Sequence, residues 1–412
     1  VSGTWANTTY VEQAGERVTR PPPGFGQLLS RSQWSGLVNF TRALGAPIVT
    51  SFAASEGTRD AQGVWTANQA GRLLDLTREA GGKIHAAEFL NEPSLIRAGG
   101  LPDDYDSSSF GRDFGIFAQW ARHNAPEMLL LGPGNLGEET VDAGVAANLM
   151  APGGAMATER LLVETASELD GISWHFYGGV SPRCGGGEGL TSAEAALSDE
   201  WLDRTLIEYD AMARLRDRHA PGKPLWLTET AQAACGGSPW AAGFRDTFRY
   251  LNQLGQLARH GVSVVMHNTL NASEYGLIDA ETMHPRPNYW ASVLWQRTMG
   301  HVVLGPSVTR SNGVRLFAHC LPQNDGGVGL LVLNPRHTSS SLRLQGNGLA
   351  WVMQADNLDD GSVSVNGIEP EVAGDGSIAG LSSISVQSAV ELPALSIAFV
   401  AMPDAANDAC RS

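Results

Sequence analysis

Two kinds of hydrophobic pattern follow one another along the chain. Up to about residue 300, short runs of β-branched and apolar residues alternate with longer stretches whose apolar positions recur every three or four residues. This alternation predicts βα units arranged around a parallel sheet. The expected strands are residues 46–53, 84–90, 128–132, 171–177, 224–229 and 263–269.

The beginning of the chain adds one more expected strand. Residues 1–9 look like the end of a strand that runs into a loop, which brings the number of strands to seven. The simplest interpretation is an α/β protein with a (β/α)8 TIM barrel over residues 1–302. Its first strand would lie upstream of Val1, in an N-terminal segment or a separate chain.

The pattern changes after residue 302. Helical periodicity is lost, and short alternating runs at 314–318, 329–333 and 342–344 are separated by turn-forming sequences rich in Asn, Asp and Gly. We therefore expect a second domain over residues 303–412, an antiparallel β-sandwich.

Composition narrows the class of protein. Of the 412 residues, 42% are hydrophobic and 17% are charged, so the chain has enough apolar material for a packed core and is not of the disordered class. The 43 acidic residues exceed the 28 Lys and Arg residues, which gives a net charge of −15 without any basic run and argues against nucleic acid as a partner. No apolar stretch reaches the roughly 18 residues that a membrane-spanning helix needs.

Two of the expected strands lead directly into a glutamate. The strand at 84–90 continues into Asn91 and Glu92, and the strand at 224–229 ends on Glu229. Active sites of TIM barrels lie at these carboxyl ends, where an unpaired charge beside apolar residues is costly. Two carboxyl groups about 5 Å apart meet the needs of retaining glycoside hydrolysis, since one donates a proton and the other attacks the anomeric carbon. We therefore single out Glu92 and Glu229 as candidate catalytic residues.

Most glutamates near strand ends are solvated or form a salt bridge, and we give this ordinary interpretation to four others. They are Glu88, Glu164, Glu208 and Glu274. Glu92 and Glu229 differ from them in their joint position on two strands and in the Asn91 that directly precedes Glu92.

Around these residues the sequence resembles the heparanases and their bacterial β-glucuronidase relatives, a family of retaining glycoside hydrolases. The likeness covers most of the chain. It is carried by residues 226–230 with the following Gly236-Gly237, and by 242–266, 275–279, 287–290, 314–320 and 399–410. The resemblance implies that Glu92 is the acid/base, that Glu229 is the nucleophile, and that Asn91 hydrogen-bonds the 2-hydroxyl of the sugar.

The family motif Trp-His-X-Tyr corresponds to residues 174–177 of this chain. By resemblance, Tyr177 donates a hydrogen bond to Glu229 and His175 lines the floor of the cleft. Without the resemblance, a structural place in the barrel core explains either residue.

A glucuronidase must also hold the carboxylate of its substrate close to an ionised nucleophile, which requires preorganised donors. Gly236 and Gly237 can direct backbone N–H groups toward that carboxylate as an anion nest, although a glycine pair is also typical of an ordinary loop turn. By resemblance, Tyr275 adds a hydroxyl and Asn268 adds an amide. The family usually has a tyrosine shortly before the two glycines, where this chain has Ala233-Ala234-Cys235.

The four cysteines fall two in each predicted domain. The resemblance implies a Cys320–Cys410 disulfide, and Cys184 and Cys235 follow neighbouring strands, where a bridge would stiffen the cleft wall. Four cysteines permit three pairings, so the sequence alone leaves the choice open. Paired cysteines would indicate a secreted or periplasmic protein. None of the usual metal-binding motifs occurs, so we expect neither a metal nor a cofactor.

Three functions remain open at this point. The first is a retaining endo-β-D-glucuronidase that cleaves internal glucuronate–glucosamine linkages of heparan sulfate or a related glycosaminoglycan. The second is an exo-acting β-glucuronidase that removes terminal glucuronate, and the third is a catalytically inactive polysaccharide-binding protein. The two glutamates argue against the third. The acidic chain would repel a sulfated polymer unless arginines such as Arg183 and Arg97 gather locally, and we prefer the endo-acting enzyme because the likeness continues into the second domain.

Overall fold

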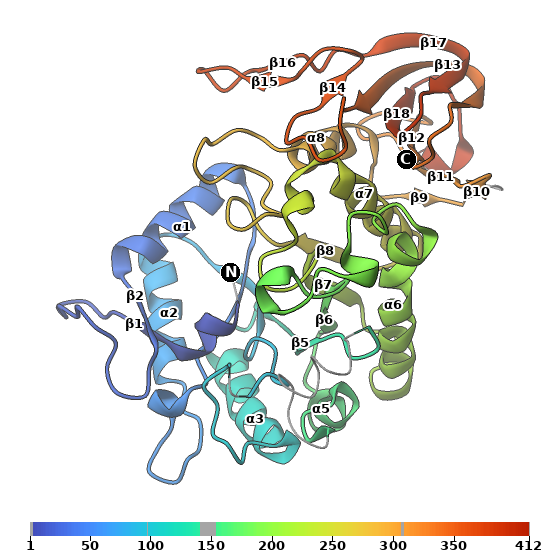
Figure 1. The fold of residues 1–412 in the computed structure, drawn as a ribbon. Helices are drawn as coiled ribbons and strands as arrows, with labels where there is room; N and C mark the ends of the chain where they lie inside the picture. Colours follow the sequence, from blue (N-terminus) through green and yellow to red (C-terminus); the bar gives the residue numbers. More distant parts are fainter. Residues whose placement is uncertain (1–2, 97, 141–153, 306–308, 412) are drawn as a thin grey trace. The chain divides into compact units, whose positions relative to one another are not determined.

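The structure is a computed structural model that describes residues 3–96, 98–140, 154–305 and 309–411. Six strands form one sheet in the order β3-β4-β5-β6-β7-β8, and helices alternate with these strands along the chain (Figure 1). The strands are β3 (Ile48–Ser51), β4 (Ile84–Glu88), β5 (Leu129–Leu136), β6 (Gly171–Tyr177), β7 (Leu225–Ala231) and β8 (Val264–His267). The helices are α1 (Arg31–Leu44), α2 (Asn68–Glu79), α3 (Ser107–Asn124), α5 (Thr158–Thr165), α6 (Asp199–His219), α7 (Phe244–Arg259) and α8 (Pro287–Thr298).

The apolar runs in the sequence become the strands of this sheet. Strand β6 coincides with the expected run at 171–177 and is buried along its whole length, as in sheets that are covered on both faces. Strand β5 continues to Leu136, beyond the expected end at residue 132. The pairs from β3 to β6 run parallel, as the alternation of strands and helices predicts.

The initial segment does not form the seventh strand that we expected in this sheet. Its described part, Thr4–Thr8, is a 3-10 turn, and the short strand β1 (Thr9–Val11) pairs with β2 (Gln27–Leu29) in a separate two-stranded sheet. The reason is local hydrogen bonding, since the Thr9 hydroxyl donates to the Trp5 carbonyl and closes a turn.

An aromatic cluster holds the carboxyl ends of β3 and β4 in place. Phe52 follows β3, Phe89 follows β4, and each ring lies 5.3 Å from the ring of Phe117 in α3. Trp65 packs edge-on against Phe89 with a centroid distance of 5.2 Å. Aromatic pairs of this kind stabilise the fold by about 1 kcal/mol each beyond the burial of their surface. The chain that leaves β4 toward Glu92 therefore starts from a well-packed position.

The C-terminal region forms an antiparallel sheet. Its strands are β9 (Val303–Leu304), β10 (Arg310–Ser311), β11 (Val314–Cys320), β12 (Val328–Asn334), β13 (Ser340–Gln354), β14 (Ser364–Val365), β17 (Ile384–Leu392) and β18 (Ser396–Met402), with a separate hairpin of β15 (Glu371–Val372) and β16 (Ile378–Ala379). Strand β13 pairs with β17 over its first part and with β18 over its last part, so the sheet encloses a core that includes Val332, Ala350 and Val400. The predicted fold class, a parallel α/β barrel type followed by antiparallel β structure, is confirmed.

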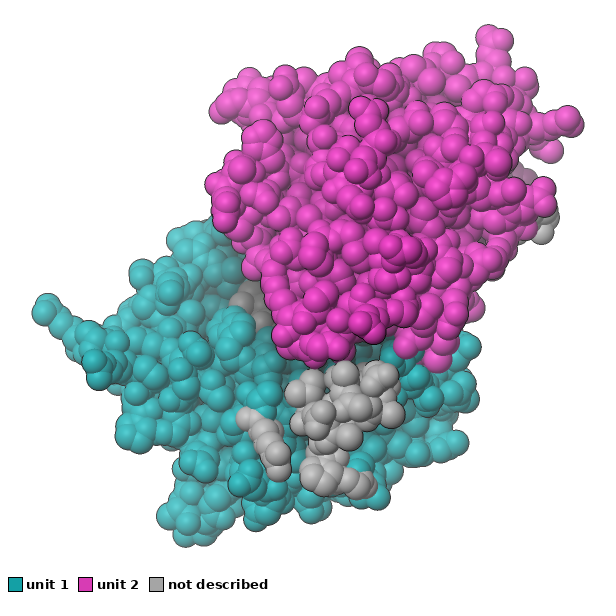
Figure 2. Space-filling view, viewed as in Figure 1, with its two compact units in different colours: residues 1–176, 210–228 teal, residues 177–209, 229–412 magenta. Residues whose placement is uncertain are grey.

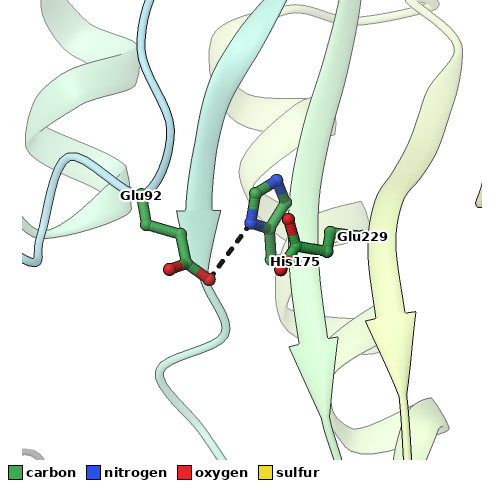
Figure 3. A group of neighbouring side chains, drawn as sticks. All are labelled: Glu92, His175 and Glu229. Carbon is green, nitrogen blue, oxygen red and sulfur yellow. Dashed lines mark hydrogen bonds and ion pairs between the residues drawn. The ribbon is translucent and has the colours of Figure 1, made fainter. Parts of the chain in front are cut away.

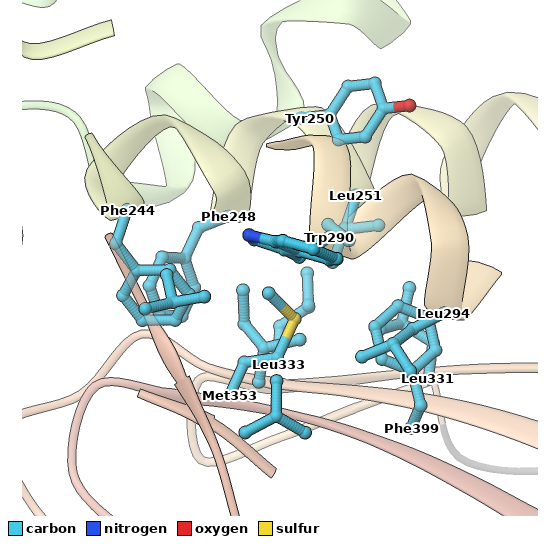
Figure 4. Packing of buried hydrophobic residues seen from close by; sticks show 14 of the residues in the cluster. Phe244, Phe248, Tyr250, Leu251, Trp290, Leu294, Leu331, Leu333, Met353 and Phe399 are labelled. Carbon is cyan, nitrogen blue, oxygen red and sulfur yellow. The ribbon is translucent and has the colours of Figure 1, made fainter. Parts of the chain in front are cut away.

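The opposite face of this antiparallel sheet packs against α7 and α8 (Figure 4). Phe244 and Phe248 of α7, Trp290 of α8, Leu331 of β12 and Phe399 of β18 are buried in one cluster. Burying a side chain of this size contributes roughly 2–3 kcal/mol. The cluster thus anchors both helices on the sheet.

The chain divides into two compact units, residues 1–176 with 210–228 and residues 177–209 with 229–412 (Figure 2). The division falls inside β6, after Phe176, and inside β7, after Thr228. The domain boundary that the sequence pattern places between residues 302 and 303 stays a prediction.

Candidate active site

Glu92 lies in the loop that follows β4, with its backbone held in an unusual conformation. Its φ of 47° is in the left-handed region, which costs a non-glycine residue about 1 kcal/mol or more. Two backbone hydrogen bonds fix this conformation: the Glu92 N–H donates to the Gly134 carbonyl of β5 at 3.1 Å, and the Glu92 carbonyl accepts from the Leu95 N–H at 2.9 Å. The side chain is almost fully buried. Backbone strain at a buried acid is typical of a functional site.

The imidazole of His175, near the end of β6, lies between two carboxyl groups. Its Nδ1 is 3.1 Å from Glu92 Oε1, and its Nε2 is 3.4 Å from Glu88 Oε2. His175 is fully buried. The ring therefore links the side chain of Glu92 to the last residue of β4.

Glu88 and Glu208 are each only 2% exposed, so neither is the solvated glutamate that the sequence suggested. Glu88 has an ion-pair contact with His175, and its Oε1 accepts hydrogen bonds from Ser173 Oγ at 2.6 Å and from Thr228 Oγ1 at 2.7 Å. Burial raises the pKa of Glu88, but the positive charge of His175 and the hydrogen bonds from Ser173 and Thr228 outweigh it, so the pKa is lowered. Glu88 is thus an ionised, buried carboxylate and not a solvated one. Its position before the end of the apolar run at 84–90 was the available signal, although the observed strand β4 ends on Glu88 itself.

Glu229 is held by a second set of contacts on β6, β7 and the end of β8. The Tyr177 hydroxyl donates to Glu229 Oε1 at 2.5 Å, and the Asn268 amide donates to the same hydroxyl at 2.9 Å. Because the hydroxyl accepts from Asn268, its own proton is directed to the carboxylate. The predicted contact between Tyr177 and Glu229 is therefore present, and the Asn268 amide contacts the Tyr177 hydroxyl.

Figure 3 draws Glu92, His175 and Glu229, with the contact between His175 Nδ1 and Glu92 Oε1 as a dashed line. Two carboxylates and an imidazole are also the kinds of ligand that metal ions take. In this protein, however, His175 Nδ1 and Glu92 Oε1 contact each other, and Glu229 Oε1 is hydrogen-bonded to Tyr177. We therefore assign no metal to these three residues.

Asn91 is buried next to Glu92. Its Oδ1 accepts from the Gly3 N–H at 2.9 Å, and its backbone is tied to the side chain of Asn7 through two hydrogen bonds. Among the described residues, the amide Nδ2 has no hydrogen-bond partner. A contact with a sugar 2-hydroxyl stays a prediction.

The glycine pair after β7 is arranged differently from a simple anion nest. The Gly237 N–H donates to the Ala233 carbonyl, so it is already used inside the loop. Burial and the negative charge of Glu229 raise the pKa of the Tyr275 hydroxyl. Tyr275 therefore keeps its proton, and its ring lies against the glycine pair, since a Cβ atom on Gly237 would come within 2.8 Å of it.

Arg183 lies directly against the glycine pair. Its guanidinium forms an ion pair with Glu274 at 2.7 Å, and a Cβ atom added to Gly236 would collide with its Nη1. Both glycines have positive φ, so a side chain at either position would also be strained. The other arginine considered for a sulfated substrate, Arg97, lies outside the described residues.

Two disulfides are present, Cys184–Cys235 and Cys320–Cys410. The first joins the loop after β6 to the loop after β7. Cys184 directly follows Arg183 in the sequence, and Cys235 directly precedes Gly236. The second ties the C-terminus to β11. The pairing is the one that we expected from the resemblance and the loop positions.

Comparison with known proteins bears on the identity of this site. No protein-family model matches the chain. The chain is 25% identical to heparanase-like protein 2 of Arabidopsis thaliana over 346 residues, which is 81% of this chain and 60% of that protein. It is 28% identical to heparanase of Gallus gallus over 420 residues, which is 93% of this chain and 75% of that protein. The chain thus spans about three fifths of the plant relative.

The fold is similar to that of a solved 4-O-α-L-rhamnosyl-β-D-glucuronidase from Fusarium oxysporum. The TM-score is 0.66, and the likeness covers 97% of this chain and 87% of that protein at 14% sequence identity. At this identity the likeness concerns the fold alone. The sequence matches extend over most of the chain and indicate common ancestry as well as a common fold. This chain is a homologue of the heparanase and β-glucuronidase family of glycoside hydrolases.

Proposed function

We propose that the chain is a retaining β-glucuronidase in which Glu92 is the acid/base and Glu229 the nucleophile. The observations that carry this proposal are the buried Glu92 beside His175, the Tyr177 hydroxyl that donates to Glu229, and the sequence likeness to heparanase over most of the chain. Retaining glycosidases place their carboxyl groups about 5–5.5 Å apart, whereas inverting enzymes need roughly 6.5–9.5 Å to admit a water molecule. Direct attack on the anomeric carbon requires the shorter spacing.

The two carboxyl groups have environments that suit different roles. Glu229 accepts a short hydrogen bond from Tyr177, which favours its ionised form and its role as a nucleophile. Glu92 faces His175 through Oε1, which leaves Oε2 to donate a proton to the glycosidic oxygen. In the first step the C–O bond breaks, the leaving alcohol takes the Glu92 proton, and Glu229 binds the anomeric carbon. In the second step Glu92 takes a proton from water, whose oxygen displaces Glu229.

Glucuronate is the proposed sugar because the loops after β6, β7 and β8 carry neutral and cationic donors. Tyr275 offers a protonated hydroxyl, and the Gly236 N–H and the Arg183 guanidinium lie beside it. Such donors stabilise a substrate carboxylate next to an ionised nucleophile. To bind the substrate carboxylate, Arg183 must break its ion pair with Glu274 or bind both carboxylates at once.

We further propose endo-acting cleavage of a glycosaminoglycan such as heparan sulfate, because the likeness to heparanase continues into the C-terminal sheet. Sizing the products from heparan sulfate tests this. Fragments of intermediate length support endo action, whereas release of free glucuronate alone supports the exo-acting alternative. If neither the polymer nor any aryl β-glucuronide is cleaved, the inactive binding protein is the correct interpretation.

A secreted or periplasmic location is part of the proposal. Both disulfides fit an oxidising compartment. Among the described residues, no helix combines the length and the apolar character that a membrane span requires. Fractionation of the native host with a non-reducing mobility assay tests the location, and a fully reduced protein in the cytosol would contradict it.

A further inference from the structure

Glu88 is a buried charge that the proposed reaction does not use. It ends β4 four positions before Glu92, and it is nearly inaccessible to solvent. An isolated buried carboxylate is costly, so a group of this kind persists where its charge is compensated or employed. Its contacts show which of these applies.

Both oxygens of Glu88 are engaged. Oε1 accepts from the hydroxyls of Ser173 and Thr228, while Oε2 faces His175 Nε2 at 3.4 Å. On its other side, the same imidazole faces Glu92 through Nδ1. The 3.4 Å contact is an ion-pair distance without a hydrogen bond, and a buried negative charge so close to an imidazole favours the positively charged form of the ring. The geometry therefore favours the imidazolium form of His175.

The backbone of β5 leaves room for this arrangement at one glycine. A Cβ atom on Gly134 would lie 2.7 Å from Glu88 Cδ and less than 3 Å from both carboxylate oxygens. The carbonyl of the same glycine accepts from the Glu92 N–H. One residue of β5 thus positions the backbone of Glu92 and makes space for the carboxylate of Glu88.

We propose that Glu88 is a positioning residue whose fixed negative charge balances a protonated His175, so that Glu92 can hold the second proton that a general acid needs. This inference rests on the proposed function of Glu92. In the acid-competent state, the pair of His175 and Glu92 holds two protons, one on Nδ1 that is shared with Glu92 Oε1 and one on Glu92 Oε2. When the glycosidic oxygen takes the proton from Oε2, the imidazolium is left facing a carboxylate on each side.

Removing the charge of Glu88 changes this balance in a definite direction. A neighbouring negative charge favours every proton that the pair of His175 and Glu92 holds. Without it, the state with two protons loses its first proton at a lower pH. The proton that remains resides on the imidazole, because imidazole is more basic than a carboxylate. A proton held by the imidazole alone is not available to the glycosidic oxygen, so the acid step slows.

The other charges around His175 do not reverse this direction. Glu229 of β7 is present in both proteins, so its charge does not differ between the wild type and the variant. Tyr177, two positions along β6, is a neutral donor to Glu229. Strand β5 contributes the uncharged Gly134, and Ser173 and Thr228 contribute hydroxyls.

The test compares the wild type with Glu88→Gln, which keeps the shape of the side chain and removes its charge. The pH profile of kcat/KM is measured with alkyl β-glucuronides, whose poor leaving group needs an acid, and with nitrophenyl β-glucuronide, which does not. We expect the alkaline limb for the alkyl substrate to move down by about 1 pH unit or more, with an approximately tenfold loss of rate at neutral pH. The loss for the nitrophenyl substrate should be much smaller.

Two further variants separate charge from structure. Glu88→Asp keeps the charge and should leave the alkaline limb near its wild-type position even if the rate falls. Ser173→Ala removes an uncharged contact to the same carboxylate and should lower stability without moving the limb. The inference would be overturned if the alkaline limb of the pH profile stayed at its wild-type position in Glu88→Gln. It would also be overturned if Ser173→Ala shifted that limb as far as Glu88→Gln does.

A readout without turnover keeps this inference distinct from the proposed function. NMR titration of isotope-labelled histidine, with the signal assigned by its loss in His175→Asn, should show His175 titrating at a lower pH in Glu88→Gln than in the wild type. If no glucuronide is cleaved but this shift is seen, the Glu88–His175 pairing stands and the glucuronidase proposal fails. If glucuronides are cleaved but the titration of His175 is unchanged, the pairing is wrong and the proposed function stands.

Discussion

Two glutamates four positions apart show how much the surroundings of a residue decide. Glu88 is the last residue of β4, with its charge compensated by hydroxyls and an imidazole, whereas Glu92 lies beyond the strand on a strained backbone. The side chains are chemically identical. Glu88 has contacts from β6 and β7 on both of its oxygens, whereas the contact of Glu92 with His175 involves Oε1, which under the proposed function leaves Oε2 for the substrate.

Replacement of the proposed nucleophile gives the most direct test at the residue scale. Glu229→Gln should abolish turnover of all β-glucuronides, by a factor of about 10⁴ or more, because the amide cannot attack the anomeric carbon. The hydrogen bond from Tyr177 to the remaining carbonyl oxygen should keep the fold intact. Steady-state kinetics and the circular dichroism spectrum are measured together. Activity close to wild type in the folded variant would contradict the assignment.

The acid/base assignment makes a prediction that depends on the leaving group. Glu92→Ala should reduce cleavage of the polymer and of alkyl glucuronides by a factor of about 10² or more, because no group protonates the leaving oxygen. Cleavage of nitrophenyl β-glucuronide should fall less in its first step, and added azide should rescue its second step. Equal losses for all substrates, without azide rescue, would speak against an acid/base role.

At the scale of elements, the sequence pattern located the strands of the parallel sheet better than it located their ends, since β5 runs four residues beyond its expected end. Strand β6 was predictable to the residue because its apolar run is bounded by Asp170 and by Gly178-Gly179. The initial segment was not, since a side-chain hydrogen bond to Trp5 closes a turn where the residue types permit a strand. The contact of β5 with Glu88 and Glu92 also has no sequence signal beyond a glycine.

That contact can be tested with a pair of glycine substitutions. Gly134→Ala should lower the free energy of unfolding by about 2–3 kcal/mol, because φ is 67° and the new methyl group would meet the Glu88 carboxylate. Gly115→Ala in α3 is the matched control, since a Cβ there meets no atom within 4 Å. The control should raise the free energy of unfolding by about 0.5–1 kcal/mol. The free energy of unfolding of both variants is measured by urea denaturation. Equal changes in the two variants would contradict the close approach of Gly134 in β5 to the Glu88 carboxylate.

At the scale of the whole molecule, buried groups tie stability to pH. His267, at the end of β8, donates through Nε2 to the Tyr275 carbonyl. Burial and the nearby charge of Arg249 lower its pKa to about 4. The unfolded chain binds a proton near pH 6.5, so folding is favoured above that pH and loses stability as the pH falls toward 4.

The loss amounts to roughly 3 kcal/mol at most, since one unit of pKa difference corresponds to about 1.4 kcal/mol. His267→Gln keeps a donor for the Tyr275 carbonyl but does not titrate, so its melting temperature should fall less between pH 7 and pH 4 than that of the wild type. Thermal unfolding followed by circular dichroism at several pH values measures the difference. Parallel curves for the two proteins would show that His267 is not the group responsible.

The sequence by itself indicated six strands of the parallel sheet, the change to antiparallel structure and the two candidate glutamates, whereas it left the pairing of the cysteines open. It could indicate the strands and the glutamates because periodicity, turn residues and strand-end charges are local features of the chain. Only the tertiary structure decided that Glu88 is a buried partner of His175, that Gly237 uses its N–H within its own loop, and that Arg183 is paired with Glu274. These outcomes depend on which groups meet across separate strands and loops. A pattern along one segment carries no information about such partners.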